Sequence, residues 1–310
     1  MTSASGLLLV DKPEGWTSHD VVAKTRGLAK TRRVGHAGTL DPMATGLLIL
    51  GINQATKLLT FLVGEDKTYE GTIRLGANTI TDDRESDFLS VAEAAQVQSI
   101  TAERLEAALE ALRGPIMQVP SSVSAIKVDG QRAYAKVRGG DEVKLAARPV
   151  TISRFDVTAK PELAAVGGNT FLDVKVTVDC SSGTYIRALA RDLGAALGVG
   201  GHLTALRRTR IGRYSLASAK PLADLTADNL EIMPMVDAAR AQFSVRDLSD
   251  QDVVDLRHGK RIELGAVGSG IEVDQPIAAI TAGGELIGML TPVGKQLRSL
   301  VIFANDSGEK

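Results

Sequence analysis

The sequence of 310 residues predicts an α+β protein, in which a mixed, mainly antiparallel sheet core with flanking helices is followed by a small all-β C-terminal domain. Two observations predict this class. Segments with strand alternation and segments with helical periodicity follow one another without a regular βαβ repeat. Short apolar runs separated by glycine-rich turns then close the chain. A hydrophobic content of 44% is ordinary for a globular protein and suffices for a substantial core.

The first two thirds of the chain supply the elements of the predicted core. Residues 7–10 form an apolar run that ends at a turn with proline and glycine, which predicts a strand. Either Thr17 or Ser18 can cap a helix that runs to about residue 28. Alternation predicts strands at 67–75 and, most strongly, at 170–179. The remaining predicted elements are a buried segment at 47–51 and helices at 55–62, from Thr101 onward and at 185–197.

The C-terminal stretch has a different pattern. Three apolar runs, 277–280, 286–290 and 297–303, are separated by Gly283-Gly284 and by Pro292-Val293-Gly294. A Gly-Gly pair between two such runs predicts a hairpin. We therefore predict a small β-rich domain at 239–310 that follows a main domain at 1–238.

Composition and motifs exclude several classes of protein. The longest early apolar run, 6–10, is far shorter than the roughly 18 residues of a membrane span, and it lacks the features of a secretory signal. We therefore expect a cytoplasmic protein without a membrane partner. A single cysteine, Cys180, excludes an internal disulfide, and no His/Cys pair has zinc-site spacing. Phosphate-loop and serine-hydrolase motifs are absent, so we expect neither a metal nor a nucleotide cofactor.

Charge is balanced over the whole chain, with 36 Lys and Arg against 37 Asp and Glu, which taken alone disfavours a nucleic-acid partner. Locally, the charge is segregated. Residues 24–33 and 204–220 each contain five bases and no acid, and 127–148 contain six bases and three acids. The acidic segments 81–110 and 224–255 each contain eight acids and two bases. A solvated helix face explains any one basic run, but three together favour a surface for an anionic ligand.

The segment 35–57, GHAGTLDPMATGLLILGINQATK, carries the strongest candidate for chemistry. Asp41 precedes Pro42, whose ring favours an extended backbone at Asp41, and the surrounding glycines leave room for another molecule to approach. An acid in such a loop is a candidate nucleophile or general base. The alternative is a structural Asx turn that starts at Asp41.

A second candidate segment, 181–191 (SSGTYIRALAR), follows the strongest predicted strand. Arg187 lies in the first turn of the predicted helix, where the helix dipole disfavours a cation, so we expect a carboxylate partner. Asp41 is a candidate, because an arginine would keep that carboxylate ionised and oriented. Alternatively, Arg187 is a surface residue that pairs with Asp192 or faces solvent.

These segments resemble the TruB family of pseudouridine synthases. GHAGTLDPMATGLL is preceded by LLLVDKPEGWTSHDVV and followed by SSGTYIRALARDLG and LTALRRTRIG, so the resemblance spans residues 6–215 in order. It implies a pseudouridine synthase fold with a PUA-like, RNA-binding C-terminal domain. It also implies that the protein flips out the uridine at position 55 in the T-arm of tRNA and isomerises it to pseudouridine without a cofactor. We expect a monomer.

The resemblance implies three catalytic residues. Asp41 matches the aspartate that attacks the uridine, and Arg187 matches the arginine that pairs with it. Tyr185 matches the tyrosine that helps to remove the C5 proton. Attack at C6 of the uracil, attack at C1′ of the ribose and a route through a glycal all remain open.

The resemblance also implies residues that bind the RNA. His36 matches a histidine of the RNA-binding loop, Tyr69 the tyrosine that stacks on the target base, and Leu206 an apolar residue of the base pocket. We further predict contacts to the RNA backbone from seven basic residues: Lys12, Arg32, Arg33, Lys57, Lys127, Arg207 and Arg208.

Two other functions compete with this one. The protein could be an RNA-binding protein that keeps the scaffold without the reaction, or an enzyme of the same chemistry that acts on another RNA. The set of Asp41, Tyr69, Tyr185 and Arg187 favours an enzyme, because a binding protein needs no positioned nucleophile. The segment 120–127, PSSVSAIK, departs from the usual family pattern of two prolines and an aromatic residue.

Overall fold

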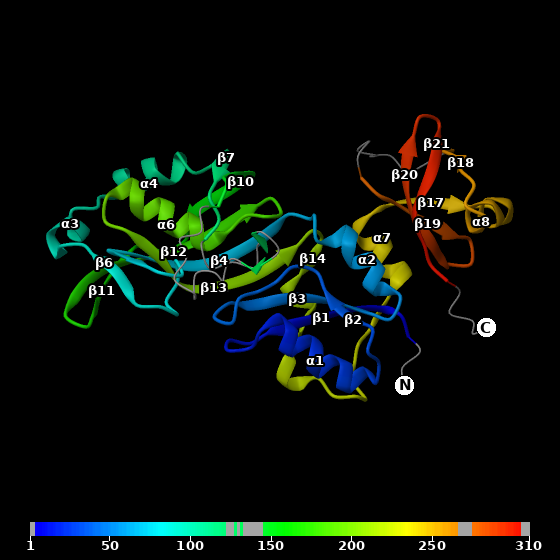
Figure 1. Ribbon diagram of the computed structural model, residues 1–310, viewed down its shortest axis with the longest axis horizontal. Coiled ribbons are helices and arrows are strands. Elements are labelled where there is room, and N and C mark those ends of the chain that lie inside the picture. Colours follow the sequence, from blue (N-terminus) through cyan, green and yellow to red (C-terminus); the bar gives the residue numbers. More distant parts are fainter. Residues whose placement is uncertain (1–3, 122–126, 129–130, 133–144, 266–274, 305–310) are drawn as a thin grey trace. The chain divides into compact units, whose positions relative to one another are not determined.

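The computed structural model describes residues 4–121, 127–128, 131–132, 145–265 and 275–304 (Figure 1). The chain forms two compact units. The first unit consists of Met1–Pro42, Gly46–Val63 and Gly212–Lys310, and the second of Met43–Thr45 and Gly64–Ile211. Each unit thus combines segments that are distant in the sequence. The domain boundary at residue 238 stays a prediction.

The N-terminal part of the first unit is built on two buried apolar strands, β1 (Gly6–Lys12) and β3 (Thr45–Ile52). They pair antiparallel over their full length, with Gly6 opposite Ile52. Three short strands extend this sheet, of which β2 pairs with β3 and the others pair with β1: β2 (Val34–His36), β15 (Lys220–Pro221) and β16 (Met233–Pro234).

Helix α1 (Ser18–Ala29) covers this sheet, and its Val21 and Val22 share a core cluster with strand residues such as Leu8 (Figure 1). Its N-cap is Thr17, whose side chain accepts a hydrogen bond from the amide of Asp20 while the Asp20 carboxylate accepts from the amide of Thr17. The predicted helix and one of its two candidate caps are thereby confirmed. A shorter helix, α2 (Ala55–Leu62), follows β3 as predicted.

The C-terminal part of the first unit contains a five-stranded sheet in the order β17-β19-β20-β21-β18. The predicted hairpin at Gly283-Gly284 joins β19 to β20, and Gly284 adopts a φ of +79° that favours glycine. Helix α8, which begins with a capping box at Ser249, is an addition to the predicted all-β pattern. The main elements are α7 (Met235–Gln242), β17 (Ser244–Leu248), α8 (Asp250–Arg257), β18 (Ile262–Glu263), β19 (Ile277–Thr281), β20 (Leu286–Val293) and β21 (Gln296–Ile302).

The second unit is built on an antiparallel sheet in the order β13-β4-β12-β10-β7. Phe155 and Phe171 are fully buried in its core. The predicted strands at 67–75 and 170–179 are confirmed as its central members. Its strands are β4 (Lys67–Leu75), β7 (Gly114–Gln118), β10 (Arg148–Val157), β12 (Asn169–Cys180) and β13 (Gly201–Ile211), with β11 (Glu162–Val166) on β12 and a separate pair of β5 (Ala77–Thr79) and β6 (Phe88–Val91).

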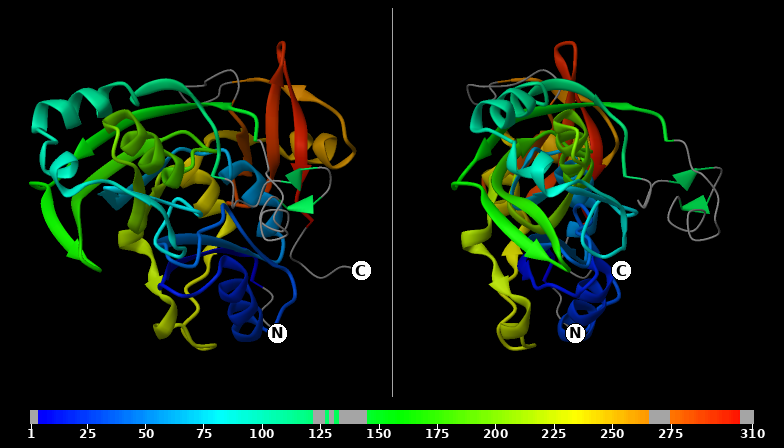
Figure 2. Two further views of the ribbon diagram at one scale, coloured as in Figure 1. Left: turned by 60° about the vertical axis from the view of Figure 1, so that its left-hand side comes forward. Right: turned by 90° about the vertical axis from the view of Figure 1, so that its left-hand side faces the viewer.

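Helix α6 (Ile186–Leu197) packs against β13 and β4, and the views in Figure 2 show it beside the sheet of the second unit. The helix approaches its own returning chain so closely that a Cβ atom at Gly194 would lie 2.1 Å from the amide nitrogen of Gly201. Only glycine fits there, so Gly194 permits the close packing of α6 on the chain that leads into β13. Among the described residues of this unit, two further helices are α3 (Ala94–Gln98) and α4 (Ala102–Glu110), the latter capped by Thr101 as predicted.

Part of the predicted basic surface lies outside the described residues. Strands β8 (Lys127–Val128) and β9 (Gln131–Arg132) form a short antiparallel pair, but 122–126 and most of the basic run at 127–148 are not described. In the described part of the chain, no helix is long and apolar enough to cross a bilayer, and no three His, Cys, Asp or Glu side chains gather as metal ligands. The predicted α+β class with a C-terminal β domain is confirmed.

Candidate active site

Asp41 lies in the irregular segment between β2 and β3, and the residues on both sides of it are held by hydrogen bonds. The hydroxyl of Ser18, which is 1% exposed, accepts from the amide of Leu40 at 2.8 Å and donates to the carbonyl of Leu40 at 3.1 Å. On the other side, the carbonyl of Pro42 accepts from the amide of Gly15 at 2.9 Å. The backbone that flanks Asp41 is therefore fixed at both neighbours.

Lys12 is fully buried and stabilises the same segment. Its ammonium group donates to the carbonyls of Trp16 at 2.6 Å, Pro13 at 3.1 Å and Pro42 at 3.4 Å. A buried ammonium group needs such acceptors, since it has lost its water. Lys12 thus orders the loop next to Asp41, and its contact with the RNA backbone stays a prediction.

His36 is the last residue of β2 and pairs with Leu50 of β3. The ring of His19, from the first turn of α1, contacts the His36 ring edge to face, with the ring centroids 5.6 Å apart. His19 is exposed and His36 is half-buried, so the two rings reach the surface of the first unit. The role of His36 in RNA binding stays a prediction.

Tyr69 and Leu206 lie on adjacent strands of the second unit and on one face of its sheet. Leu206 of β13 is opposite Gly71 of β4, and its side chain covers that glycine, with the Leu206 Cδ1 atom 3.6 Å from where a Cβ would be. Tyr69 precedes Gly71 by two residues and so points to the same face. Tyr69 is 8% and Leu206 9% exposed. The structure therefore brings together the two residues predicted to line the base pocket.

Arg187 lies in the first turn of α6 and is buried, with 7% exposure. Its guanidinium group pairs with the carboxylate of Asp83 at 3.2 Å and donates to the carbonyl of Thr81 at 2.9 Å. The alternative of a surface arginine is therefore wrong, and Asp192 pairs with Arg191 instead. The pairing of Arg187 with Asp41 stays a prediction.

The sequence analysis missed Asp83, because the pattern around it is that of an acidic, solvated segment. In the structure Asp83 is 1% exposed, and its carboxylate also accepts hydrogen bonds from the Thr81 hydroxyl and from the amide of Glu85. Its neighbour Asp82 pairs with Arg191 of α6 at 3.2 Å, and burial raises the pKa of Asp82. Two consecutive acids of one loop thus hold two arginines on successive turns of α6.

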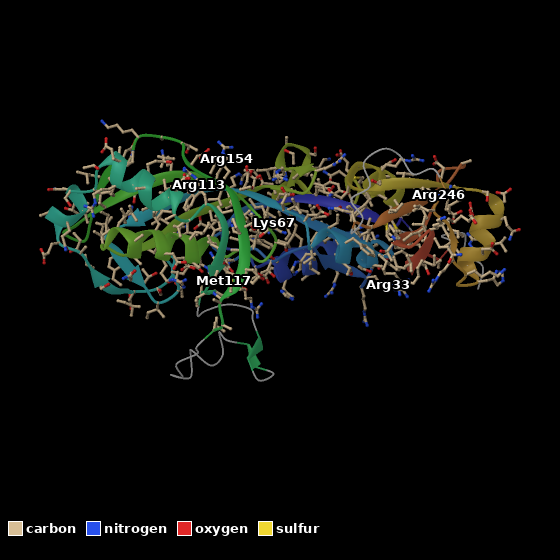
Figure 3. All side chains as sticks on the ribbon, turned by 90° about the horizontal axis from the view of Figure 1, so that it is seen from above. Arg33, Lys67, Arg113, Met117, Arg154 and Arg246 are labelled. Carbon is tan, nitrogen blue, oxygen red and sulfur yellow. The ribbon has the colours of Figure 1, made fainter. Side chains whose placement is uncertain are left out.

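Lys67 begins β4, two residues before Tyr69, and is labelled in Figure 3. It is 7% exposed and donates to the carbonyl of Glu65 at 2.5 Å. Burial, together with the charge of Arg208, lowers the pKa of Lys67 to about 8. Its cross-strand partner on β12 is Cys180, and burial raises the pKa of that thiol to about 11. The end of β4 next to Tyr69 is thus a region in which charge is poorly solvated.

The remaining predicted RNA contacts differ in exposure. Arg207 is half-buried and donates to the hydroxyl of Thr45 at 3.2 Å. Arg208 is 1% exposed, and a phosphate contact by Arg208 stays a prediction. The side chain of Lys127 lies outside the described residues. Three of the predicted contacts are exposed and accessible to RNA: Arg32, Arg33 (labelled in Figure 3) and Lys57.

Three family models match consecutive parts of the chain. The N-terminal domain of TruB family pseudouridylate synthases matches residues 26–186, and the C-terminal domain of tRNA pseudouridylate synthase B matches 187–236. The C-terminal model of tRNA pseudouridine synthase II matches 243–304. The fold is thus that of a pseudouridylate synthase. The chain belongs to the TruB family.

Close relatives cover nearly the whole chain. The tRNA pseudouridine synthase B of Paenarthrobacter aurescens (strain TC1) is 56% identical over 304 residues, which are 97% of this chain and 95% of the relative. That of Arthrobacter sp. (strain FB24) is 57% identical over 305 residues, 97% of both chains. A chain from a structure of an H/ACA RNP bound to a substrate RNA containing 2′-deoxyuridine shares the fold, with a TM-score of 0.70 at 23% identity over 97% of this chain and 86% of that one. A Cbf5-Nop10-Gar1 complex has the same TM-score and identity over 97% and 85%.

Replacement of Asp83 tests the buried ion pair. Asp83→Asn should lower the free energy of unfolding by about 3 kcal/mol, because the Arg187 guanidinium stays buried without its carboxylate. Urea denaturation followed by circular dichroism measures this loss. Asp87→Asn, at an exposed position of the same segment, is the matched control and should change stability by no more than about 0.5 kcal/mol. Equal effects of the two substitutions would contradict the assignment.

Lys67 should make stability depend on pH. Because its pKa in the folded protein is about 8 and its ordinary value is 10.5, the unfolded chain binds more protons between these values, and stability rises with pH there. At pH 7, Lys67→Met should therefore have a larger free energy of unfolding than wild type. This difference should decrease by about 3 kcal/mol between pH 7 and pH 10.5. Urea denaturation of both proteins at several pH values measures it. A difference that is constant with pH would rule out a depressed pKa.

Proposed function

We propose that this protein converts the uridine at position 55 in the T-arm of tRNA to pseudouridine. The observation that carries the proposal is Asp41 in the element GHAGTLDPMATG, where hydrogen bonds fix the backbone on both sides of the carboxylate. Relatives that share more than half of their residues with this chain are named tRNA pseudouridine synthase B.

The reaction is an isomerisation. The N1–C1′ bond of uridine breaks, the uracil turns, and a C5–C1′ bond forms. C5 then loses its proton and N1 gains one, so the product has the composition of the substrate. Such a reaction requires a nucleophile, a base for the C5 proton and a pocket in which uracil can turn.

The residues of the candidate site can fill these roles. Asp41 is the catalytic carboxylate, which attacks at C6 or at C1′ or acts on a route through a glycal, and the resemblance assigns Arg187 as its partner. Tyr185 accepts the proton from C5. Tyr69 stacks on the flipped base, and Leu206, on the same face of the sheet, forms an apolar wall of the pocket. Asp83 acts indirectly, because it fixes the direction of the Arg187 guanidinium.

Binding must supply the free energy that opens the RNA loop. Flipping a base costs a few kcal/mol, and stacking on an aromatic ring such as Tyr69 returns about 1–3 kcal/mol. Contacts to phosphates from the exposed Arg32, Arg33 and Lys57 and from Arg207 supply a further, salt-dependent part. RNA of this kind is recognised by loop shape and splayed bases.

The C-terminal β domain contributes to binding of the same tRNA, as a PUA-like domain would. Ile262 of β18 pairs with Leu297 of β21, so the next residues outward, Arg261 and Arg298, lie at one edge, and both are exposed. Two like charges at adjacent positions are unfavourable without an anion between them. A phosphate group of the RNA would supply that anion. The protein acts as a monomer in the cytoplasm, where its substrate is found.

Replacement of Asp41 tests the reaction. Asp41→Asn should abolish pseudouridine formation on an unmodified tRNA transcript, because an amide is no nucleophile, while tRNA affinity changes by less than about threefold. Pseudouridine mapping at position 55 and a filter-binding assay provide the two measurements. Asp228→Asn, an exposed substitution with the same charge change, is the control and should keep full activity. Turnover by Asp41→Asn would exclude Asp41 as the catalytic residue. Pseudouridine formed by wild type at another position, or in another RNA, would show that the substrate is not uridine 55 of tRNA.

Charge reversal tests the C-terminal edge. Arg261→Glu combined with Arg298→Glu should weaken tRNA binding and reduce the slope of log Kd against log salt by about 1 to 2, since each lost phosphate contact removes about 0.7 to 0.9. The single-turnover rate at saturating protein should stay the same. Lys160→Glu combined with Lys175→Glu, two exposed positions with the same change in net charge, is the control. Equal salt slopes for the two double variants would exclude this edge from the interface.

A further inference from the structure

Gln118, the last residue of β7, forms two hydrogen bonds with the backbone of Tyr185 and has no assigned role in the reaction proposed above. Its side-chain oxygen accepts from the amide of Tyr185 at 2.8 Å, and its side-chain nitrogen donates to the carbonyl of Tyr185 at 3.1 Å. Gln118 is 2% exposed. One buried side chain thus satisfies both backbone groups of a single residue, which is the residue proposed to take the C5 proton.

The backbone of Tyr185 lies at the start of α6, where the helix begins. Tyr185 is the N-cap residue of α6, in an extended conformation with φ −102° and ψ 106°, and its side chain makes no capping hydrogen bond. Its carbonyl also accepts the first helical hydrogen bond, from the amide of Leu189 at 3.2 Å. Together with Gln118 this fills both lone pairs of the carbonyl, so rotation of the Tyr185 backbone would break hydrogen bonds in a buried place.

The chain that leaves β7 is tied to α6 at a second point. The carbonyl of Val119 accepts from Arg191 at 2.7 Å, and the other terminal nitrogen of Arg191 pairs with Asp82 at 3.2 Å. The loop that holds Arg187 through Asp83 and the end of β7 that holds Tyr185 through Gln118 are thereby linked by one arginine. Tyr185 and Arg187 are fixed from two directions.

We propose that Gln118 is a positioning residue for Tyr185. By holding both backbone groups of Tyr185, it fixes the direction in which the phenol leaves the start of α6, and therefore the distance from its oxygen to the C5 proton. Gln118 does not touch the substrate. The proposal rests on the proposed function, and it adds the requirement that proton removal from C5 depends on a residue of β7.

Gln118→Met is the test, because methionine keeps the length and volume of glutamine and removes both hydrogen bonds. Single-turnover rates should fall by about 10- to 100-fold, since an error of about 1 Å in a reacting group costs up to about 100-fold. The Kd for tRNA should stay within about threefold, because substrate binding is not the function of Gln118. With tRNA that carries 5-deuterated uridine, the variant should show a primary isotope effect at least as large as that of wild type.

A merely structural role predicts another result. It would lower the amount of active protein without slowing the proton transfer, so the isotope effect would be unchanged in the surviving fraction and the single-turnover rate constant would equal that of wild type. Gln242→Met is the matched control: Gln242 is also buried, and its side-chain oxygen accepts from the amide of Arg213 at 2.8 Å. This variant should lose stability but keep the rate and the isotope effect of wild type.

If Gln118→Met does not fold, Gln118→Glu decides, because it keeps the acceptor for the Tyr185 amide and loses the donor to the Tyr185 carbonyl. Its rate should lie below that of wild type with the isotope effect retained. A wild-type rate in whichever variant folds, or a slower rate whose isotope effect disappears, would overturn the proposal. Failure of wild type to form pseudouridine would instead refute the proposed function, so the two failures are distinguishable.

Discussion

The candidate site depends on one constraint, which is that buried backbone groups must find hydrogen-bond partners. Asp41 lies in an irregular segment, and Tyr185 is the N-cap of α6, where the helix supplies a partner for the carbonyl but none for the amide. Buried polar side chains do so instead: the Ser18 hydroxyl binds both backbone groups of Leu40, beside Asp41, and the Gln118 amide binds both backbone groups of Tyr185. In each unit, the backbone beside a proposed catalytic residue is thereby held by hydrogen bonds from a buried side chain. The proposed catalytic side chains can therefore be held in fixed positions although they lie outside regular strands, where the backbone leaves room for an RNA base.

Buried charge imposes a second constraint, and the chain meets it in different ways. The ammonium group of Lys12 donates hydrogen bonds to backbone carbonyls, and the guanidinium of Arg187 pairs with the Asp83 carboxylate. For Lys67, burial lowers the pKa to about 8. Each solution costs folding free energy relative to an apolar side chain of the same size. Lys12 stabilises the loop of the proposed nucleophile, Lys67 precedes the proposed stacking residue by two positions, and Arg187 is itself proposed to balance charge. In such places an enzyme gains from electric fields that water would screen.

The elements that the sequence predicts correctly have local causes. Helix α1 follows from Thr17 and the spacing of Val21 and Val22, the strand β12 from its alternation, and the β19–β20 hairpin from Gly283-Gly284. The alternative of a surface arginine at 187 is wrong, and Lys12 and Arg208 are also buried, which the sequence did not predict. Charged residues are exposed in most proteins, and nothing near them in the sequence reveals a buried partner.

The sequence by itself determined several of the strands and helices and the resemblance to the TruB family, and it predicted Asp41 as the catalytic candidate, because caps, periodicity and a dense motif are encoded within a few neighbouring residues. Only the tertiary structure decided that Asp83 holds Arg187 and that Gln118 holds Tyr185, over separations of 104 and 67 residues. Such pairs form when strands and loops distant in the chain are packed into one sheet. Their hydrogen bonds depend on distances of a few tenths of an ångström, which no local pattern specifies.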